Sequence, residues 1–274
     1  MCQKAGAKIK VMVDAHPPSG VLGNSLEQTS IEFLLDVLKK LNTEKLFEIQ
    51  IQQYNHQEIR RLNRKQFGKN MNETHCFRGY PIFGSIKQFY DTEDEYILHL
   101  DSDMLFYEKD GFSWIKEAIS VLKENPDIIC VLPCGGPPTE DGSLHQGTTE
   151  YIQDKDRSLY LFKNFTSRHY LIHRKRFLDF LPIKTLWLSW REPLKSKIFG
   201  KGKLLCWETM VEKALEDSNF WRADLMMEEA WSLHSINRTE EFYLKLPSII
   251  ERLERGDYPA KQAGHFDLLY NLWN

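Results

Sequence analysis

The chain has 274 residues, of which 42% are hydrophobic, 27% charged and 12% aromatic, a composition typical of globular proteins and unlike that of disordered or fibrous chains. A chain of this length buries a core without the help of disulfides. Its formal net charge of −3 provides no global positive field for a polyanion, which argues against a dedicated nucleic-acid-binding protein.

Strand-like and helix-like patterns alternate from the start of the chain. Residues 9–13 form a short apolar run that ends at Asp14 and predicts a strand. Apolar residues recur at helical spacing over 31–41 and predict an amphipathic helix. Apolar and polar residues alternate over 47–53, which predicts a second strand that is half exposed or lies near a sheet edge.

The same alternation continues to residue 132. One apolar face over 80–90 predicts a helix entered through Pro81, and residues 96–100 predict a strand. A helix at 113–124 and a strand at 128–132 follow. This order predicts an α/β fold with a mostly parallel central sheet and helices on both faces. Ligands of such sheets bind at the carboxyl ends of the strands.

The second half of the chain is less regular. Residues 160–172 are expected to be extended, and helices are expected at 206–217 and at 240–255, the latter with a break at Pro247. Internal repeats and low-complexity linkers are absent from the sequence. We therefore predict a single domain over 1–274 with a C-terminal elaboration.

Two carboxylates stand one residue apart at the end of the predicted strand 96–100. Asp101 and Asp103 could serve only to end the strand and cap a turn. However, two like charges at a strand end lower stability unless a cation or hydrogen bonds offset them. A carboxylate pair at this edge of a sheet also suits a divalent cation that contacts the phosphates of a ligand. The pattern therefore favours a metal site.

The strand followed by Asp101-Ser102-Asp103 resembles the DxD motif of the GT-A nucleotide-sugar glycosyltransferases, glycosyltransferase family 2 in particular. The resemblance implies a Rossmann-like GT-A fold. Residues 1–135 would bind a nucleoside-diphosphate sugar, and residues 136–274 would bind the acceptor and supply C-terminal helices. It also implies Mn²⁺ or Mg²⁺ between the motif and the diphosphate, with Asp103 as a direct ligand and Asp101 beside the ribose and the metal.

The resemblance assigns further roles in the second half of the chain. Glu208, at the start of a predicted helix, would be the base that deprotonates the acceptor hydroxyl; alternatively it complements the helix dipole. His234 would complete the metal shell; alternatively it is a hydrogen-bonded core histidine. Glu228 and Glu229 are the next candidates for the base.

Donor-binding residues are expected in both halves of the chain. Negative charge grows on the diphosphate as the glycosidic bond breaks, so nearby cations stabilise it. Arg78 precedes the predicted helix 80–90, and Lys201 and Lys203 lie on a Gly-flanked loop that could close over the donor. Each of these cations is alternatively a solvated surface residue. Asp14, at the end of the first strand, is the predicted acidic contact to the donor.

Together these features predict a metal-dependent, hexosyltransferase-like enzyme. It would move a sugar from a nucleoside-diphosphate donor to a hydroxyl of a glycan or glycolipid acceptor, with inversion at the anomeric carbon. Two alternatives remain: a non-catalytic nucleotide- or metal-binding module of the same fold, and a nucleotidyltransferase. The latter class carries a glycine-rich phosphate loop after the first strand, which Gly20 and Gly23 are too sparse to form.

The cysteines and the N-terminal residues bear on the compartment. Five scattered cysteines, an odd number, are typical of reduced thiols. Residues 1–10 lack the apolar core of a secretory signal, and no window approaches 18 uncharged apolar residues. The sequence therefore predicts a cytoplasmic protein with no transmembrane span, and it leaves peripheral contact with a membrane open.

Overall fold

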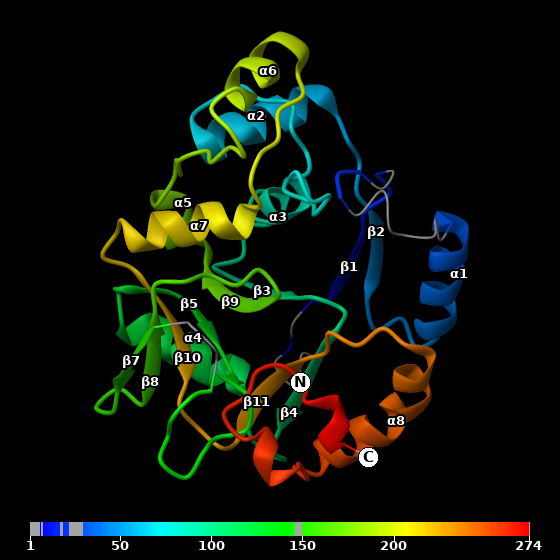
Figure 1. Ribbon diagram of the computed structural model, residues 1–274, viewed down its shortest axis with the longest axis vertical. Helices are drawn as coiled ribbons and strands as arrows, with labels where there is room; N and C mark the ends of the chain where they lie inside the picture. Colours follow the sequence, from blue (N-terminus) through cyan, green and yellow to red (C-terminus); the bar gives the residue numbers. More distant parts are fainter. Residues whose placement is uncertain (1–5, 7, 17–18, 22–29, 146–149, 274) are drawn as a thin grey trace.

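The computed structural model describes residues 6, 8–16, 19–21, 30–145 and 150–273 and has a mixed α/β fold (Figure 1). The strands are β1 (Lys10–Val13), β2 (Glu48–Ile51), β3 (Tyr96–Leu100), β4 (Met104–Glu108), β5 (Ile128–Leu132), β6 (Cys134–Gly135), β7 (Tyr151–Asp154), β8 (Leu159–Phe162), β9 (His169–His173), β10 (Trp221–Leu225) and β11 (Ala230–His234). The α-helices are α1 (Ile31–Leu41), α2 (His56–Phe67), α3 (Phe83–Lys87), α4 (Trp114–Glu124), α5 (Arg174–Asp179), α6 (Glu192–Phe199), α7 (Trp207–Glu216) and α8 (Glu240–Glu254).

The main sheet has six strands in the order β3-β9-β5-β10-β8-β7. β5 and β10 are parallel neighbours, whereas the other four neighbouring pairs are antiparallel. The prediction of a mostly parallel sheet is therefore wrong. The reason is that β9, which comes from the second half of the chain, lies between β3 and β5 and runs in the opposite direction. β3, β5 and β10 still run in one direction, so their carboxyl ends share one edge.

Helices cover both faces of this sheet (Figure 1). On one face, Trp114 and Ile115 of α4 form a core with Ile128 and Val131 of β5. On the other face, α2, α3, α5 and α7 share a larger core with β3, β5 and β9, and Trp207 of α7 is buried in it. Because aromatic side chains bury a large apolar area, this core fixes the start of α7.

A second, three-stranded sheet has the order β4-β11-β6. β4 and β11 are antiparallel, and their register places Met104 opposite His234. Phe242 and Ile249 of α8 pack into one core with Trp231 of β11. β1 and β2 form a separate parallel pair, with the half-exposed second strand that the alternation predicts.

Several elements differ in extent from the sequence-based expectation. The helix expected at 80–90 is reduced to α3, because Pro81 forms an antiparallel bridge with His75 and residues 88–90 form a turn. Pro247 lies inside α8 without ending it, since buried apolar side chains on both sides of the proline hold the helix against its core. The extended segment 160–172 is divided into β8 and β9.

A buried ion pair on β10 provides a stability test. Arg222 donates to Asp224 through Nε (2.9 Å) and Nη2 (3.0 Å), and both residues are buried. Asp224→Asn would leave the guanidinium buried without a counter-charge, so we expect the free energy of unfolding to fall by about 3–5 kcal/mol. Urea unfolding monitored by circular dichroism measures this loss.

The matched control is Asp179→Asn, which breaks the exposed pair with Lys175. That change should cost at most about 1 kcal/mol, because exposed pairs contribute little. If the two variants lost equal stability, Arg222 and Asp224 would not act as a buried pair.

Candidate functional site

The turn that carries the two aspartates joins the main sheet to the second sheet. β3 ends at Leu100 and β4 begins at Met104, so Asp101 and Asp103 lie between the sheets. The β4–β11 register places His234 beside this turn, and its Nε2 lies 3.7 Å from Oδ2 of Asp103. Two residues that are 131 positions apart in the sequence are thus neighbours, as a site built from Asp103 and His234 requires.

Hydrogen bonds fix the orientation of the His234 ring. Its Nδ1 lies 3.0 Å from Oδ1 of Asp267. Because an ionised carboxylate only accepts hydrogen bonds, Nδ1 carries the proton and the lone pair lies on Nε2. Nε2 faces Asp103 and accepts a close contact from Nη1 of Arg168. A carboxylate behind the imidazole is the usual second partner of a metal-binding histidine.

The two oxygens of Asp103 have different surroundings. Oδ2 accepts a hydrogen bond from Nη2 of Arg238 at 2.6 Å. Oδ1 is buried and has no hydrogen-bond partner among the described residues. A buried carboxylate oxygen without a partner is costly unless a ligand satisfies it. This oxygen is therefore available to a cation.

Asp101 lies in the same turn with other partners. Its backbone N–H donates to the carbonyl of Arg168 at 2.6 Å, and its Oδ1 lies 3.1 Å from Nε2 of His99. The side chain is 45% exposed, compared with 32% for Asp103. Asp101 is thus accessible to a ligand, whereas Asp103 is oriented toward His234.

The residues present could supply only some of the ligands of Mn²⁺ or Mg²⁺. In the parts of the chain that the structure describes, no group of three or more His, Cys, Asp or Glu side chains could hold a metal. Mg²⁺ is commonly held by one or two carboxylates together with water and substrate phosphates. Asp103, with its unpartnered oxygen, supplies part of such a shell, whereas Nε2 of the buried His234 is occupied by the guanidinium of Arg168.

Glu208 lies in the first turn of α7, close enough to the turn of Asp101 and Asp103 to feel the charge of Asp101. Oγ of Ser167 donates to its Oε2 at 3.2 Å. Burial raises the pKa of Glu208 despite the opposing effects of that hydrogen bond and the positive charge of Arg168, and the negative charge of Asp101 raises it further. The charges of Asp101 and Arg168 therefore act directly on Glu208.

A pair of thiols lies at the start of α7. Cys206 is the N-cap residue, and its Sγ lies 2.9 Å from Sγ of Cys76. The hydrogen bond from Cys206 lowers the pKa of Cys76 to about 6 although burial opposes the shift. The four cysteines that the structure describes are free thiols. The Cys76 contact anchors the helix that carries Glu208.

The alternative bases Glu228 and Glu229 lie elsewhere. They form the turn that precedes β11, whereas His234 ends that strand. At the rise of a strand, four residues separate the two ends by about 13 Å. The backbone carbonyl of Glu229 accepts from Lys109, at the far end of β4. Neither glutamate is near the turn of Asp101 and Asp103.

Asp14 belongs to a separate polar cluster that follows β1 and β2. The hydroxyl of Tyr54 donates to its Oδ1 at 2.6 Å, and Nε2 of His75 lies 3.0 Å from its Oδ2. Burial alone would raise the pKa of Asp14, but the bonds from His75 and Tyr54 outweigh it and lower that pKa. The rings of His16 and His75 lie 4.2 Å apart. The cluster thus combines a carboxylate with aromatic surfaces.

The three predicted phosphate-binding cations are exposed. Arg78 lies over the ring of Phe77, whose N–H donates to the carbonyl of Leu204 just before α7. The backbone N–H of Lys203 bonds to Glu192 at 2.9 Å. Among the described residues, no hydrogen bond or ion pair links Lys201 or Lys203 to Asp101 or Asp103. Arg78 therefore lies near the start of α7, whereas the two lysines lie in the segment between α6 and α7.

Several residues at the site escape sequence analysis. Arg168, Arg238, Asp267 and Ser167 all contact predicted site residues. They lie in loops or just before elements, where no periodic pattern or motif marks them. The sequence gives one indirect signal. A carboxylate and a histidine that lie close together are expected to be hydrogen-bonded by further side chains, which orient the imidazole and balance the charge of the carboxylate.

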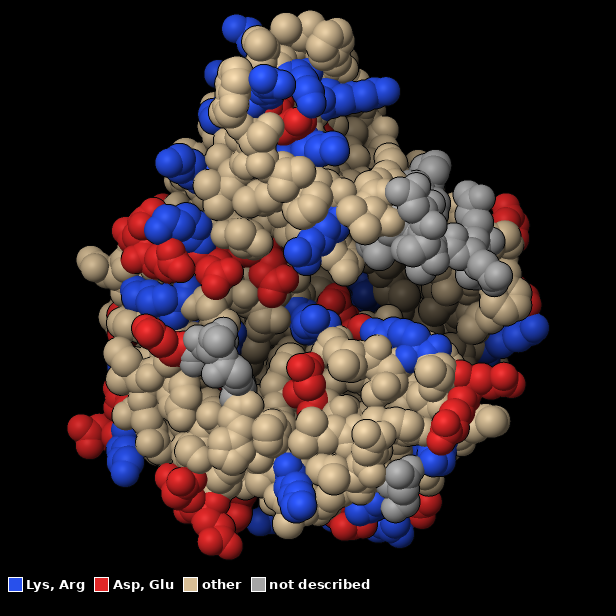
Figure 2. Space-filling view, in the orientation of Figure 1, with Lys and Arg blue, Asp and Glu red and all other residues tan. Residues whose placement is uncertain are grey.

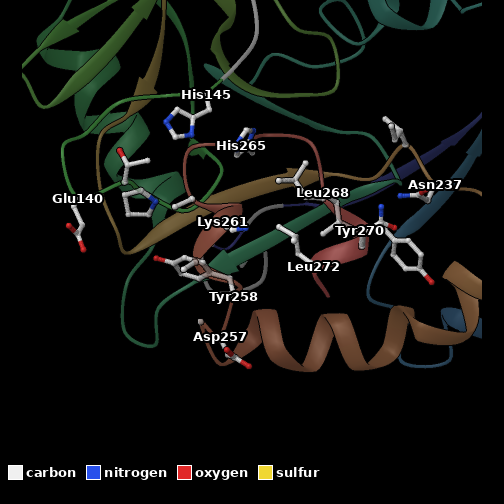
Figure 3. Close-up of a pocket in the computed structure, with 18 of the residues that line it drawn as sticks. Glu140, His145, Asn237, Asp257, Tyr258, Lys261, His265, Leu268, Tyr270 and Leu272 are labelled. Atoms are coloured by element: carbon white, nitrogen blue, oxygen red, sulfur yellow. The ribbon is translucent and has the colours of Figure 1, made fainter. Parts of the chain in front are cut away.

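A large cavity lies next to the site. It has a volume of about 1500 Å³ and is lined by three segments within 138–145, 236–237 and 256–272 (Figure 3). Asn237 in its wall precedes Arg238, and Leu268 follows Asp267 and donates to the carbonyl of His234. Tyr258, Tyr270 and His145 also line it (Figure 3). The loops that carry Arg238 and Asp267 therefore also form part of the cavity wall.

The face viewed in Figure 2 is hollowed near its middle, where acidic and basic side chains lie close together.

The sequence matches no protein-family model, and no curated protein shows significant similarity to it. Function must therefore be inferred from the site itself. Its chemistry comprises a partial shell for a cation, a carboxylate of raised pKa and flanking guanidinium groups.

Proposed function

We propose that the protein is a metal-dependent glycosyltransferase of the GT-A type, which transfers a hexose from a nucleoside diphosphate to a hydroxyl acceptor with inversion. One observation carries the proposal. Asp103 has a buried, unpartnered Oδ1, and its Oδ2 lies 3.7 Å from Nε2 of His234; the charge of Asp101 in the same turn acts on Glu208, whose pKa is raised. The parallel edge formed by β3, β5 and β10 supports a ligand site at this place.

Asp103 and His234 would hold Mn²⁺ or Mg²⁺, which when bound supplies positive charge to the diphosphate leaving group. Asp267 orients His234 through Nδ1, and Nε2 would become a ligand atom once the guanidinium of Arg168 turns from it toward the diphosphate. Arg168 and Arg238 contact the same imidazole and carboxylate. Their N–H groups are positioned to donate to phosphate oxygens, because guanidinium groups bind phosphates through paired hydrogen bonds.

Glu208 would accept the proton of the acceptor hydroxyl as that oxygen attacks the anomeric carbon and the bond to the diphosphate breaks. Its raised pKa makes the carboxylate a stronger base than an exposed glutamate. Ser167 holds the carboxylate in place through a 3.2 Å hydrogen bond. A single base and no enzyme nucleophile suit direct, inverting displacement.

Two neighbouring regions suit the two ends of the substrates. The rings of His16, Tyr54 and His75 beside Asp14 offer stacking surfaces and a hydrogen-bond acceptor for a nucleoside. The cavity in Figure 3 offers Tyr258 and Tyr270 together with polar groups, a combination that suits a carbohydrate acceptor. Arg78, Lys201 and Lys203 remain candidate donor contacts that would require movement of their exposed segments.

The proposal is tested by a turnover assay with UDP, GDP, CDP and dTDP sugars, in which released nucleoside diphosphate is measured with Mn²⁺, with Mg²⁺ and with a chelator. We expect at least one donor to be turned over with metal and none with the chelator. Equal turnover in the chelator would overturn the role of the metal. Binding of a donor without turnover under any metal would favour the non-catalytic binding module.

A further inference from the structure

The segment that contains α6 projects from the end of the molecule (Figure 1). Its two arms pair at the base: Trp187 and Leu204 form an antiparallel bridge, and Leu188 donates to the carbonyl of Lys203 at 2.9 Å. α6 therefore lies at the tip of a hairpin-like projection. The described residues include no helix that is long and apolar enough to cross a membrane.

Large apolar side chains of the projection are exposed to solvent. Trp190 is 80% exposed and Phe199 is 70% exposed. Leu194 and Ile198, four residues apart, share one face of α6, and Trp190 lies in the turn that precedes the helix. The tip patch consists of Leu188, Trp190, Leu194, Ile198 and Phe199. A contiguous apolar patch of this kind marks an interaction surface rather than ordinary surface.

Positive charge surrounds the tip patch. The cationic residues of the projection are Arg191, Lys195, Lys197, Lys201 and Lys203, and its one acidic residue is Glu192. Their formal net charge is +4, whereas the whole chain carries −3. Figure 2 shows Lys and Arg side chains flanking the uncharged surface at this end of the molecule. The charge pattern is complementary to an anionic surface.

Internal contacts hold the two arms of the projection together. Glu192 is buried; it binds Nζ of Lys195 at 2.8 Å and the backbone N–H of Lys203 at 2.9 Å. The N–H of Gly202 donates to Glu73 on the body of the protein at 2.8 Å. A Cβ at Gly202 would lie 2.4 Å from the ring of Trp187, so the arms are closely packed. The exposed apolar side chains are thus presented by an ordered scaffold.

We propose that the tip patch docks on an anionic lipid bilayer, with its apolar side chains in the interface and its cations at the headgroups. Exposed Trp, Phe and Leu beside Lys and Arg are the composition of interfacial membrane-binding segments. The charge complementarity favours this occupant over an uncharged apolar partner. The proposal does not depend on the glycosyltransferase assignment, because the apolar residues of the tip patch and Lys197 have no role in the proposed reaction.

Co-sedimentation of the full chain with vesicles tests the proposal. Vesicles of phosphatidylcholine mixed with phosphatidylglycerol in equal parts are compared with vesicles of phosphatidylcholine alone. We expect preferential binding to the anionic vesicles that weakens as salt is raised. Trp190→Ala with Phe199→Ala should weaken binding about 100-fold, since each side chain loses an interfacial burial worth roughly tenfold. Lys197→Ala should weaken it about fivefold.

The matched control is Leu244→Ala, which removes an apolar side chain that is 76% exposed on α8. It should leave vesicle binding unchanged, and thermal unfolding should verify that each variant is folded. Absence of binding by the parent chain to anionic vesicles would overturn the proposal. So would equal losses in the tip variants and in Leu244→Ala. Concentration-dependent self-association that the double variant abolishes, without vesicle binding, would assign the patch to a second copy of the chain instead.

Discussion

Replacing Glu208 by glutamine should lower the kcat of sugar transfer by about 10² to 10⁴ while leaving the affinity for the donor nearly unchanged. The amide keeps the shape of the side chain but cannot accept the proton of the acceptor hydroxyl, and a positioned base contributes about this factor. The measurement is the rate of transfer together with the dissociation constant of the donor, both with saturating Mn²⁺.

The chain offers a close control for this substitution. Glu212 lies one turn further along α7, and burial raises its pKa as well. Glu212→Gln should nevertheless retain transfer, because among the described residues Glu212 has no hydrogen bond like the one that Ser167 donates to Glu208. Transfer by Glu208→Gln within about threefold of the parent, well below the contribution of a general base, would contradict the role of Glu208.

The pH profile follows from the same pKa shift. Burial raises the pKa of Glu208, so the carboxyl becomes protonated at a higher pH than an exposed glutamate would. Only the ionised form accepts a proton. Hence kcat/KM should fall as the pH decreases through a value above the ordinary pKa of glutamate, and activity should be fully present at higher pH.

Replacing Asp103 by asparagine should weaken the binding of Mn²⁺ and of the donor together. The substitution removes the charge of the carboxylate whose Oδ1 is unpartnered. Loss of an outer partner of a metal ligand already costs about 10- to 100-fold in metal affinity. We therefore expect about 100-fold or more for Asp103→Asn, and a smaller loss for Asp267→Asn, which affects only the orientation of His234. Activity titrated with Mn²⁺ gives both values.

A purely structural role of Asp103 would give a different result. Its Oδ2 accepts a 2.6 Å hydrogen bond from Arg238. If that pair only supported the fold, Arg238→Gln would reproduce the effect of Asp103→Asn on stability, and neither substitution would change the concentration of Mn²⁺ needed for activity. That outcome would contradict the metal site.

Local patterns predict the elements that carry the site, because these elements depend on neighbouring residues in the chain. Apolar runs define β3 and β5, and the apolar period of α7 places Glu208 in its first turn. The order of the strands could not be predicted in this way. β9 pairs with β3 and β5 through residues that are distant in sequence, and the period of a strand does not specify its neighbours.

The partners of the site residues depend on the same long-range packing. Arg168 is adjacent to Asp101 because β9 begins opposite the end of β3. Arg238 and Asp267 reach the turn from loops that follow β11 and precede the C-terminus. Likewise, Trp190 is exposed because it lies on the projection, and the local sequence pattern does not predict that exposure. Such residues are recognisable only once the sheets are assembled.

Isothermal titration calorimetry of the parent chain with nucleoside-diphosphate sugars, in Mn²⁺ and then in a chelator, tests the central proposal most directly. The diphosphate and the carboxylates of Asp101 and Asp103 repel each other unless a cation lies between them. The proposed site therefore predicts that at least one of the UDP, GDP, CDP and dTDP sugars binds with Mn²⁺ and that this binding is lost in the chelator. Equal binding in both conditions would contradict it.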